Sequence, residues 1–167
     1  MKLDWLEPEM QKAIEALTEP QRVAVVLYGE ARSESLLGLV AVGCVIRNRV
    51  KADLHGDSKP DWWGEGYSDV VTRPWQFSCL SPKGGVPNYR KVVKFARRLT
   101  DKTPITDAKE KQCIWIAHGV IGDYVIDITK GADHYHTAML MPRPRWARGK
   151  DPVVQQGAHV FYRLEAA

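Results

Sequence analysis

The chain lacks any apolar run long enough to span a bilayer, and its N-terminal residues lack the uninterrupted apolar stretch of a signal peptide. Asp4, Glu7 and Glu9 occur where that stretch would lie. Repeats and low-complexity segments are also missing, so the sequence indicates no linker or disordered tail. We therefore expect a soluble protein that is cytoplasmic when synthesised.

Cysteine is scarce as well. The three cysteines, Cys44, Cys79 and Cys113, are odd in number and have no metal-binding or redox spacing. A disulfide framework is therefore not expected, and the pattern is typical of a reducing compartment. Cys44 and Cys113 fall within apolar helical patterns, and we interpret them as small buried side chains. We expect no cofactor.

The size and composition favour one globular domain. The chain has 167 residues, of which 44% are hydrophobic, and domains most often have about 100–150 residues. We predict a single domain over residues 1–167, present as a monomer.

The charge of the chain favours anionic partners. The net charge is +4 and the pI is near 9.0, which suits nucleic acid, anionic cell-wall polymer or lipid head groups. Basic residues are concentrated in RPRWARGK, residues 143–150, where Trp146 lies among them. Because a solvated loop is the commoner explanation of such a cluster, the charge alone does not select a partner.

Four helices are predicted from capping residues and apolar spacing. Thr18, followed by Glu19 and Pro20, signals a helix that runs to about Ala31. Residues 23–27 of this helix are apolar around nearly the whole circumference, which indicates a buried helix. The other helices are expected at about 36–50 with Ser33 or Ser35 as the cap, at 89–99, and at 107–121 with Thr106 as the cap.

The remaining segments predict a long loop and a small β element. Residues 52–87 have no sustained period, and loops of this length are uncommon unless they have a function. The segments ADHYHTAM and AHVFYRL alternate like short strands. The fold class is therefore expected to be mainly α (α+β), with a small β element.

Glu30 follows an unusually apolar stretch, VAVVLYG. In a helix it shares a face with Val26 and Leu27. A carboxylate on that face loses hydration, which favours its neutral form, as a general acid requires. Alternatively, Glu30 turns outwards at the helix end or pairs with Arg32 or Arg47, and periodicity alone does not decide between these possibilities.

Five segments occur in one order: YGEARSES, VAVGCVIRNRV, PWQFSC, GADHYHT and HVFYR, over roughly residues 22–162. This series resembles the cell-wall hydrolase family typified by the spore cortex-lytic enzyme SleB, which also includes phage endolysins. The resemblance implies a lysozyme-like or lytic transglycosylase-like domain that cleaves peptidoglycan glycan strands, with Glu30 as the catalytic acid. At the position of Ser33, directly before Glu34, members of the family more often have glycine. Spore enzymes of this family commonly carry a signal peptide and a separate wall-binding module, and the sequence shows the pattern of neither. We therefore expect a phage endolysin-like member.

The PWQFSC and GADHYHT segments supply the expected substrate-binding residues. An amide and a hydroxyl beside an aromatic ring suit the acetamido and hydroxyl groups of a sugar, although Phe77 is also explained by core packing. Tyr135 is expected either to stack on a sugar or to be buried on the opposite face from its neighbours. The set is Gln76, Phe77, Ser78, His134, Tyr135 and His136.

Three alternatives stay open. Cys79 could be a nucleophile served by a histidine, although the sequence places no base beside it. Asp133, His134 and His136 could bind zinc as in an amidase, because the two histidines share one face of a strand, but no third strong ligand is found. A basic module without catalytic activity could bind nucleic acid or wall polymer through residues 143–150.

The expected reaction is cleavage between N-acetylmuramic acid and N-acetylglucosamine. Most glycosidases have a second carboxylate, for which Glu34, Asp69 and Asp133 are candidates. A lytic transglycosylase needs none, since the 6-hydroxyl of the muramic acid attacks internally. We expect this mechanism with Glu30 as acid and then base, and a hydrolytic muramidase or glucosaminidase is the alternative. The expected partner is peptidoglycan and not nucleic acid. The resemblance to endolysins implies, in addition, a separate holin-type pore through which the protein reaches the wall after synthesis.

Overall fold

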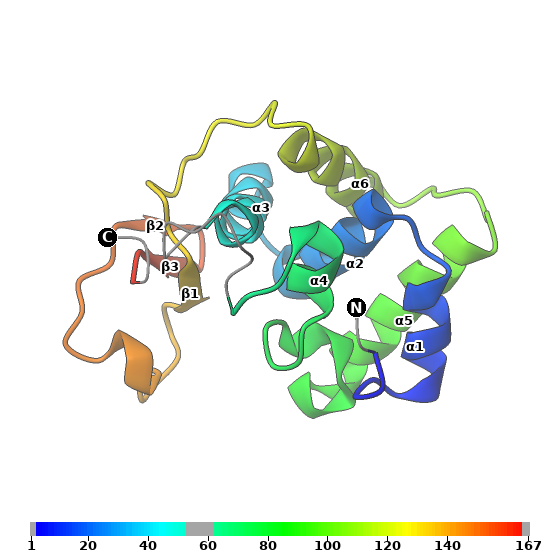
Figure 1. The fold of residues 1–167 in the computed structure, drawn as a ribbon, viewed down its shortest axis with the longest axis horizontal. Helices are drawn as coiled ribbons and strands as arrows, with labels where there is room; N and C mark the ends of the chain where they lie inside the picture. Colours follow the sequence, from blue (N-terminus) through cyan, green and yellow to red (C-terminus); the bar gives the residue numbers. More distant parts are fainter. Residues whose placement is uncertain (1–2, 53–61, 165–167) are drawn as a thin grey trace.

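Helices form most of the fold, and a small sheet lies at one end of it (Figure 1). The structure, a computed structural model, describes residues 3–52 and 62–164. Its helices are α1 (Pro8–Glu15), α2 (Glu19–Ala31), α3 (Leu36–Lys51), α4 (Gly66–Thr72), α5 (Val86–Thr100) and α6 (Ala108–Ile121). Its 3-10 turns are η1 (Ser78–Leu80), η2 (Pro82–Gly84) and η3 (Arg145–Ala147), and its strands are β1 (His134–Thr137), β2 (Val154–Gln156) and β3 (His159–Tyr162). The predicted fold class, mainly α with a small β element, is confirmed.

Helix α2 is the buried centre of the helical part. All five residues from Val23 to Leu27 are fully buried, as the continuous apolar stretch predicts. The helix contacts α3, α4, α5 and α6. At its start the Gln21 side chain accepts a hydrogen bond from the Thr18 amide at 2.9 Å, which satisfies one of the amides left unpaired at a helix end. The C-terminal end of α2, where Glu30 lies, is therefore held on several sides.

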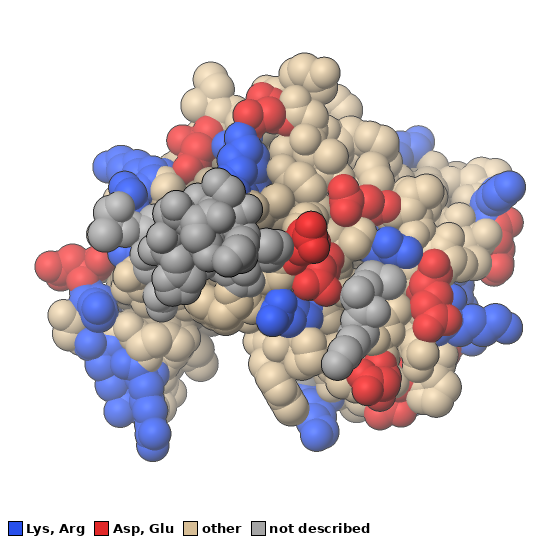
Figure 2. All heavy atoms as spheres, viewed as in Figure 1, with Lys and Arg blue, Asp and Glu red and all other residues tan. Residues whose placement is uncertain are grey.

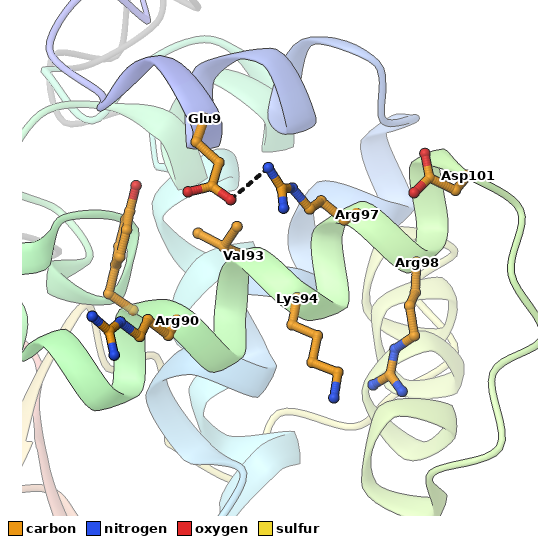
Figure 3. Close-up of a pocket in the computed structure, with 8 residues that line it drawn as sticks. Glu9, Arg90, Val93, Lys94, Arg97, Arg98 and Asp101 are labelled. Carbon is orange, nitrogen blue, oxygen red and sulfur yellow. Dashed lines mark ion pairs between the residues drawn. The ribbon is translucent and has the colours of Figure 1, made fainter.

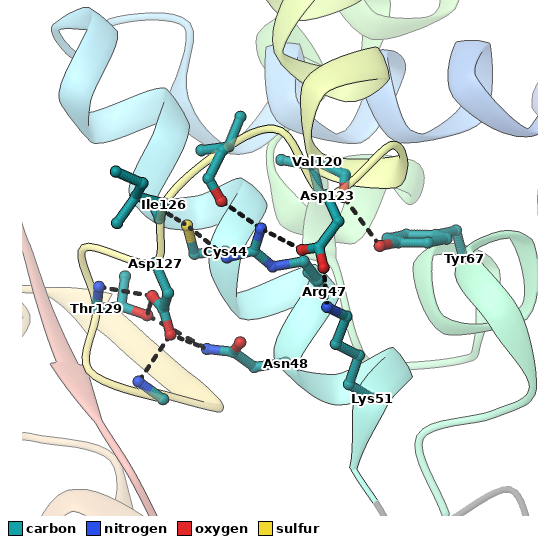
Figure 4. Close-up of polar contacts among 12 residues, drawn as sticks. Cys44, Arg47, Asn48, Lys51, Tyr67, Val120, Asp123, Ile126, Asp127 and Thr129 are labelled. Atoms are coloured by element: carbon teal, nitrogen blue, oxygen red, sulfur yellow. Dashed lines mark hydrogen bonds and ion pairs between the residues drawn. The ribbon is translucent and has the colours of Figure 1, made fainter.

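Polar contacts fix the segment after α6 against α3 (Figure 4). Buried Arg47 forms an ion pair with Asp123, with 2.9 Å between nitrogen and oxygen. Asn48 donates hydrogen bonds to the Asp127 carboxylate at 3.1 Å and to the Ala132 carbonyl at 2.9 Å. Because this segment leads directly into β1, these contacts also position the strand relative to the helices. No helix within residues 3–52 and 62–164 is long and apolar enough to cross a membrane.

The sheet has three antiparallel strands in the order β1-β3-β2. Tyr135 lies opposite Phe161, and His136 lies opposite Val160. Since successive side chains of a strand point to opposite faces, Tyr135 lies on one face of the sheet and His136 on the other. The two predicted strand segments are confirmed, whereas β2 was not predicted.

Two of the sequence expectations about secondary structure are wrong. Residues 52–87 are not irregular throughout, because they contain α4 as well as η1 and η2. With seven residues, α4 is too short to show an apolar period.

The cap of α6 is Asp107 instead of Thr106, since the Asp107 carboxylate accepts the Glu110 amide at 2.9 Å. Helix α1 was not predicted, whereas Ser35 caps α3 as expected.

Candidate active site

The Glu30 carboxylate lies at the end of α2, where the helical part of the molecule meets the sheet. Its Oε1 accepts a hydrogen bond from the Cys79 amide at 3.1 Å, and its Oε2 accepts one from the Tyr135 hydroxyl at 3.1 Å. Helix α2, turn η1 and strand β1 therefore converge on one partly exposed carboxylate. The alternative pairings are not formed, because Arg32 and Arg47 bind other side chains.

Gly29 allows η1 to approach α2 closely. A Cβ at this position would lie 2.5 Å from both the Cβ and the Sγ of Cys79, and 3.0 Å from a methyl group of Val92. Any larger residue would therefore push the Cys79 amide away from Glu30. The glycine that precedes Glu30 in the sequence is explained by this contact.

Cys79 contributes its backbone amide to the site. Its side chain is 1% exposed, and burial, together with the nearby Glu30 charge, raises the pKa of the thiol well above its ordinary value. The thiol therefore stays protonated and is a poor nucleophile. This environment argues against the cysteine-peptidase alternative.

The Tyr135 hydroxyl is held as a neutral hydrogen-bond donor. Burial, and next the charge of Glu30, raise the pKa of this phenol well above its ordinary value. A neutral phenol donates one hydrogen bond, and here that bond goes to Oε2 of Glu30. Tyr135 therefore faces the carboxylate from the sheet side.

Arg49 is a buried cation beside this cluster that the sequence analysis missed. Its Nε donates to the Asp133 carbonyl at 2.7 Å and its Nη1 to Oε1 of Gln76 at 2.9 Å, while the guanidinium lies 5.4 Å from the centre of the Phe77 ring. Burial lowers the pKa of Arg49, and the nearby Tyr135 and Asp133 are among the groups that oppose this effect. Gln76 and buried Phe77 therefore contact the site through Arg49.

Strand β1 divides the predicted residues between the two faces of the sheet. Tyr135 faces Glu30, whereas His134 and His136 face the other side and pack against the Trp146 ring, with centroids 5.0 Å and 5.6 Å away. The predicted shared face of the two histidines is confirmed, but the structure does not bring them to Glu30. Across the part of the chain that the structure describes, no group of three or more His, Cys, Asp and Glu side chains could hold a metal ion.

The three candidates for a second carboxylate all bind backbone amides. Their contacts are Glu34 with Ala158 at 3.0 Å, Asp69 with Glu65 at 3.2 Å and Asp133 with Leu164 at 2.9 Å. Asp133 also lies 2.7 Å from Nδ1 of His134. These contacts give each carboxylate a role in holding the fold together.

The basic segment, residues 143–150, lies on one side of a notch in the outline of the molecule. Figure 2 shows Lys and Arg side chains gathered at the lower left, where Figure 1 places η3, and the notch separates this tip from the rest of the molecule. Trp146 is half-buried, whereas Arg143, Arg145 and Arg148 are exposed. Ser78, at the start of η1, is also exposed.

A separate pocket of about 240 Å³ lies between α1 and α5 (Figure 3). Arg90, Lys94 and Arg97 of α5 line it, and Arg97 forms an ion pair with Glu9 at 2.7 Å. None of its lining residues binds Glu30. This pocket therefore belongs to a different surface.

A helical part and a small sheet that meet over one carboxylate define a lysozyme-like fold. The family model described as "Cell Wall Hydrolase" matches residues 33–162, and the chain belongs to this family. The match begins three residues after Glu30. No sequence among curated proteins matches the chain significantly.

Two solved structures share this fold. The catalytic domain of the germination-specific lytic transglycosylase SleB from Bacillus anthracis is 25% identical, with a TM-score of 0.56 over 87% of this chain and 93% of that chain. The catalytic domain of the Bacillus cereus SleB protein is 23% identical, with a TM-score of 0.55 over 87% of this chain and 89% of that chain. The resemblance found in the sequence is confirmed at the level of family and fold.

Proposed function

We propose that the chain cleaves the glycan backbone of peptidoglycan, with Glu30 as the group that transfers the proton. The observation that carries this proposal is the Glu30 carboxylate held between the Cys79 amide and the Tyr135 hydroxyl at the meeting point of helices and sheet. Membership of the cell wall hydrolase family supports it, as does the fold shared with a lytic transglycosylase. Of the predicted sugar-binding residues, Ser78 is exposed at the start of η1, the turn that carries the Cys79 amide, whereas Phe77 is buried in the core.

The proposed reaction needs one carboxyl group. Glu30, as the acid, protonates the glycosidic oxygen between N-acetylmuramic acid and N-acetylglucosamine, and the bond from C1 to that oxygen breaks. The 6-hydroxyl of the muramic acid then attacks C1, and its proton returns to the Glu30 carboxylate. The products are a new N-acetylglucosamine end and a 1,6-anhydro-muramic acid end. No water is consumed.

The contacts of the other carboxylates support a mechanism with a single catalytic carboxylate. Hydrolytic glycosidases place a second carboxyl group about 5–10 Å from the first, directed at the same sugar. Glu34, Asp69 and Asp133 accept hydrogen bonds from backbone amides, as Glu30 itself does. They differ from Glu30 in burial or pairing, because the Asp133 and Glu34 side chains are only 3% and 9% exposed and Asp69 forms an ion pair with Arg73. Tyr135 and Cys79 keep Glu30 oriented through both steps, because each donates to a different oxygen of its carboxylate.

Mass spectrometry of digested sacculi tests the proposal. The released muropeptides are expected to end in 1,6-anhydro-muramic acid, to be one water lighter than hydrolysis products, and to resist borohydride. Reducible muramic acid ends would instead identify a hydrolytic muramidase, and reducible N-acetylglucosamine ends a glucosaminidase. An undigested sacculus would support the basic module without catalytic activity.

The zinc amidase alternative has its own test. His134 and His136 share one face of β1, the observation that favours it, although both rings pack against Trp146. Exhaustive chelation is expected to leave the lysis of sacculi unchanged. Loss of lysis that zinc restores would support the amidase.

The endolysin role is a further part of the proposal. The exposed cations of residues 143–150 suit an anionic wall polymer, and we propose a monomer that is made in the cytoplasm and acts on the wall after release through a holin-type pore. Induced expression in bacteria is expected to lyse the cells only when such a pore is co-expressed. Lysis without a pore would contradict this route.

A further inference from the structure

The exposed ring of Trp75 is unusual in its position and its backbone. This side chain is 83% exposed, although tryptophan is normally largely buried. Its φ of 68° lies in the left-handed region that residues other than glycine avoid. Backbone strain of this kind persists where the surrounding structure enforces it, and it is often found at binding sites. The structure thus holds a large apolar ring in water at a conformational cost.

Lys83 lies beside this ring and adds a positive charge. Its Nζ is 5.8 Å from the centre of the Trp75 ring, and its amide is held by the Ser81 hydroxyl at 3.3 Å. In the described ranges no carboxylate lies within ion-pair distance of Lys83. The two residues therefore form an exposed surface, the Trp75–Lys83 platform, with one aromatic face and one available ammonium group.

The platform belongs to the same segment that positions Glu30. Gln76, the next residue after Trp75, binds Arg49, and the amide of Cys79 binds Glu30. Cys79 lies four positions after Trp75, which limits the distance between their Cα atoms to about 14 Å even in a fully extended chain. The platform is therefore close enough to Glu30 for one glycan strand to contact both.

We propose that Trp75 and Lys83 form a subsite for a muramic acid residue that carries its acidic peptide, an inference that rests on the glycan-cleaving function proposed above. The apolar face of the sugar stacks on the Trp75 ring, since aromatic rings offer apolar area with little conformational freedom to lose. The ammonium of Lys83 pairs with a carboxylate of the peptide, which N-acetylglucosamine lacks. The platform thus distinguishes the two alternating sugars of the strand.

The test compares two substrates with the full chain. Soluble glycan strands that bear their peptides are compared with the same strands after the peptide carboxylates have been converted to neutral amides. Trp75→Gly removes the ring, and glycine suits the backbone conformation at this position, so the variant is expected to fold. We expect it to raise KM about tenfold on both substrates, a loss of binding free energy of roughly 1.4 kcal/mol, and to change kcat little. Trp75→Phe is expected to restore most of the binding. Lys83→Gln is expected to raise KM severalfold only on the strands whose peptide carboxylates are free.

The chain offers matched controls for both variants. Trp115 on α6 is 68% exposed and Lys94 on α5 is exposed, and neither contacts the Glu30 cluster, so Trp115→Ala and Lys94→Gln are expected to leave both KM values unchanged. The subsite is refuted if Trp75→Gly matches Trp115→Ala, or if Lys83→Gln affects both substrates equally. A wild-type chain that cleaves neither substrate refutes the glycan-cleaving function, and with it this inference.

Discussion

Substitution of Gly29 by alanine tests how closely the site depends on the contact between α2 and η1. The new Cβ would lie 2.5 Å from the Cβ of Cys79, so Cys79 must move by about 1 Å to reach ordinary van der Waals contact. The amide of Cys79 now lies 3.1 Å from Oε1 of Glu30, and the same displacement would break that hydrogen bond. The substitution therefore acts on the catalytic carboxylate through a neighbouring backbone.

The expected loss of activity exceeds the loss of stability. Overpacking costs about 1–3 kcal/mol, whereas alanine is favoured over glycine inside a helix by about 1 kcal/mol. The net cost for Gly29→Ala is then about 0–2 kcal/mol, which lowers Tm by at most about 8 °C in a chain of this size. A displacement of about 1 Å at a catalytic group can reduce the rate about 100-fold. Sacculus clearing and thermal melting measure the two effects.

A second substitution supplies the control for Gly29→Ala. Cys79→Gly removes the Cβ that the new methyl group meets but keeps the amide that binds Glu30. The double variant is therefore expected to recover much of the activity that Gly29→Ala loses. Near-normal activity of Gly29→Ala, or a double variant no more active than the single one, would refute the reasoning.

Three further predictions concern other groups. Tyr135→Phe removes the hydroxyl bound to Oε2 of Glu30 and is expected to slow clearing about tenfold or more, as the loss of a hydrogen bond to a charged group of about 1.5–3 kcal/mol would; unchanged clearing would contradict it. Burial lowers the pKa of His159 below its ordinary 6.5, although Glu34 opposes this effect. Protons therefore bind preferentially to the unfolded chain, and the unfolding free energy falls as pH drops below about 6.5. His159→Gln should flatten this pH dependence in denaturant titrations at pH 7.5 and 5.5. Neutralising residues 143, 145 and 148 together should slow clearing of intact sacculi more than cleavage of short glycans, because long-range attraction acts most on a polymer; equal losses would argue for a role within the cleft.

The helical part was predictable where one segment carries its own signal. The apolar stretch before Glu30 predicted a buried helix, and Ser35 predicted a start for α3, because both signals depend on neighbouring residues only. Helix α4 escaped prediction because its seven residues are too few for a period. Residues 53–61, part of the predicted long loop, lie outside the described residues.

The surroundings of Glu30 were less predictable, because they depend on residues distant in the sequence. The Cys79 amide has no side-chain signature, since every residue except proline carries an amide. Arg49 could be suspected from its position three residues after buried Ile46 on α3, but its partners come from two other segments. The sequence did not indicate which face of β1 would meet Glu30, because the side on which His134 lies depends on its packing against Trp146.

Replacement of Glu30 by glutamine tests the central claim most directly. The amide oxygen can still accept the Cys79 amide, and the amide nitrogen can donate to the Tyr135 hydroxyl, so stability should change by no more than about 1 kcal/mol. The variant cannot transfer the proton, and release of glycan fragments from sacculi is expected to fall by at least about 100- to 10,000-fold. Glu34→Gln, which alters a carboxylate bound to the Ala158 amide, is the matched control and should keep most of its activity. A Glu30→Gln protein that still releases fragments at a rate near that of the wild type would contradict the account.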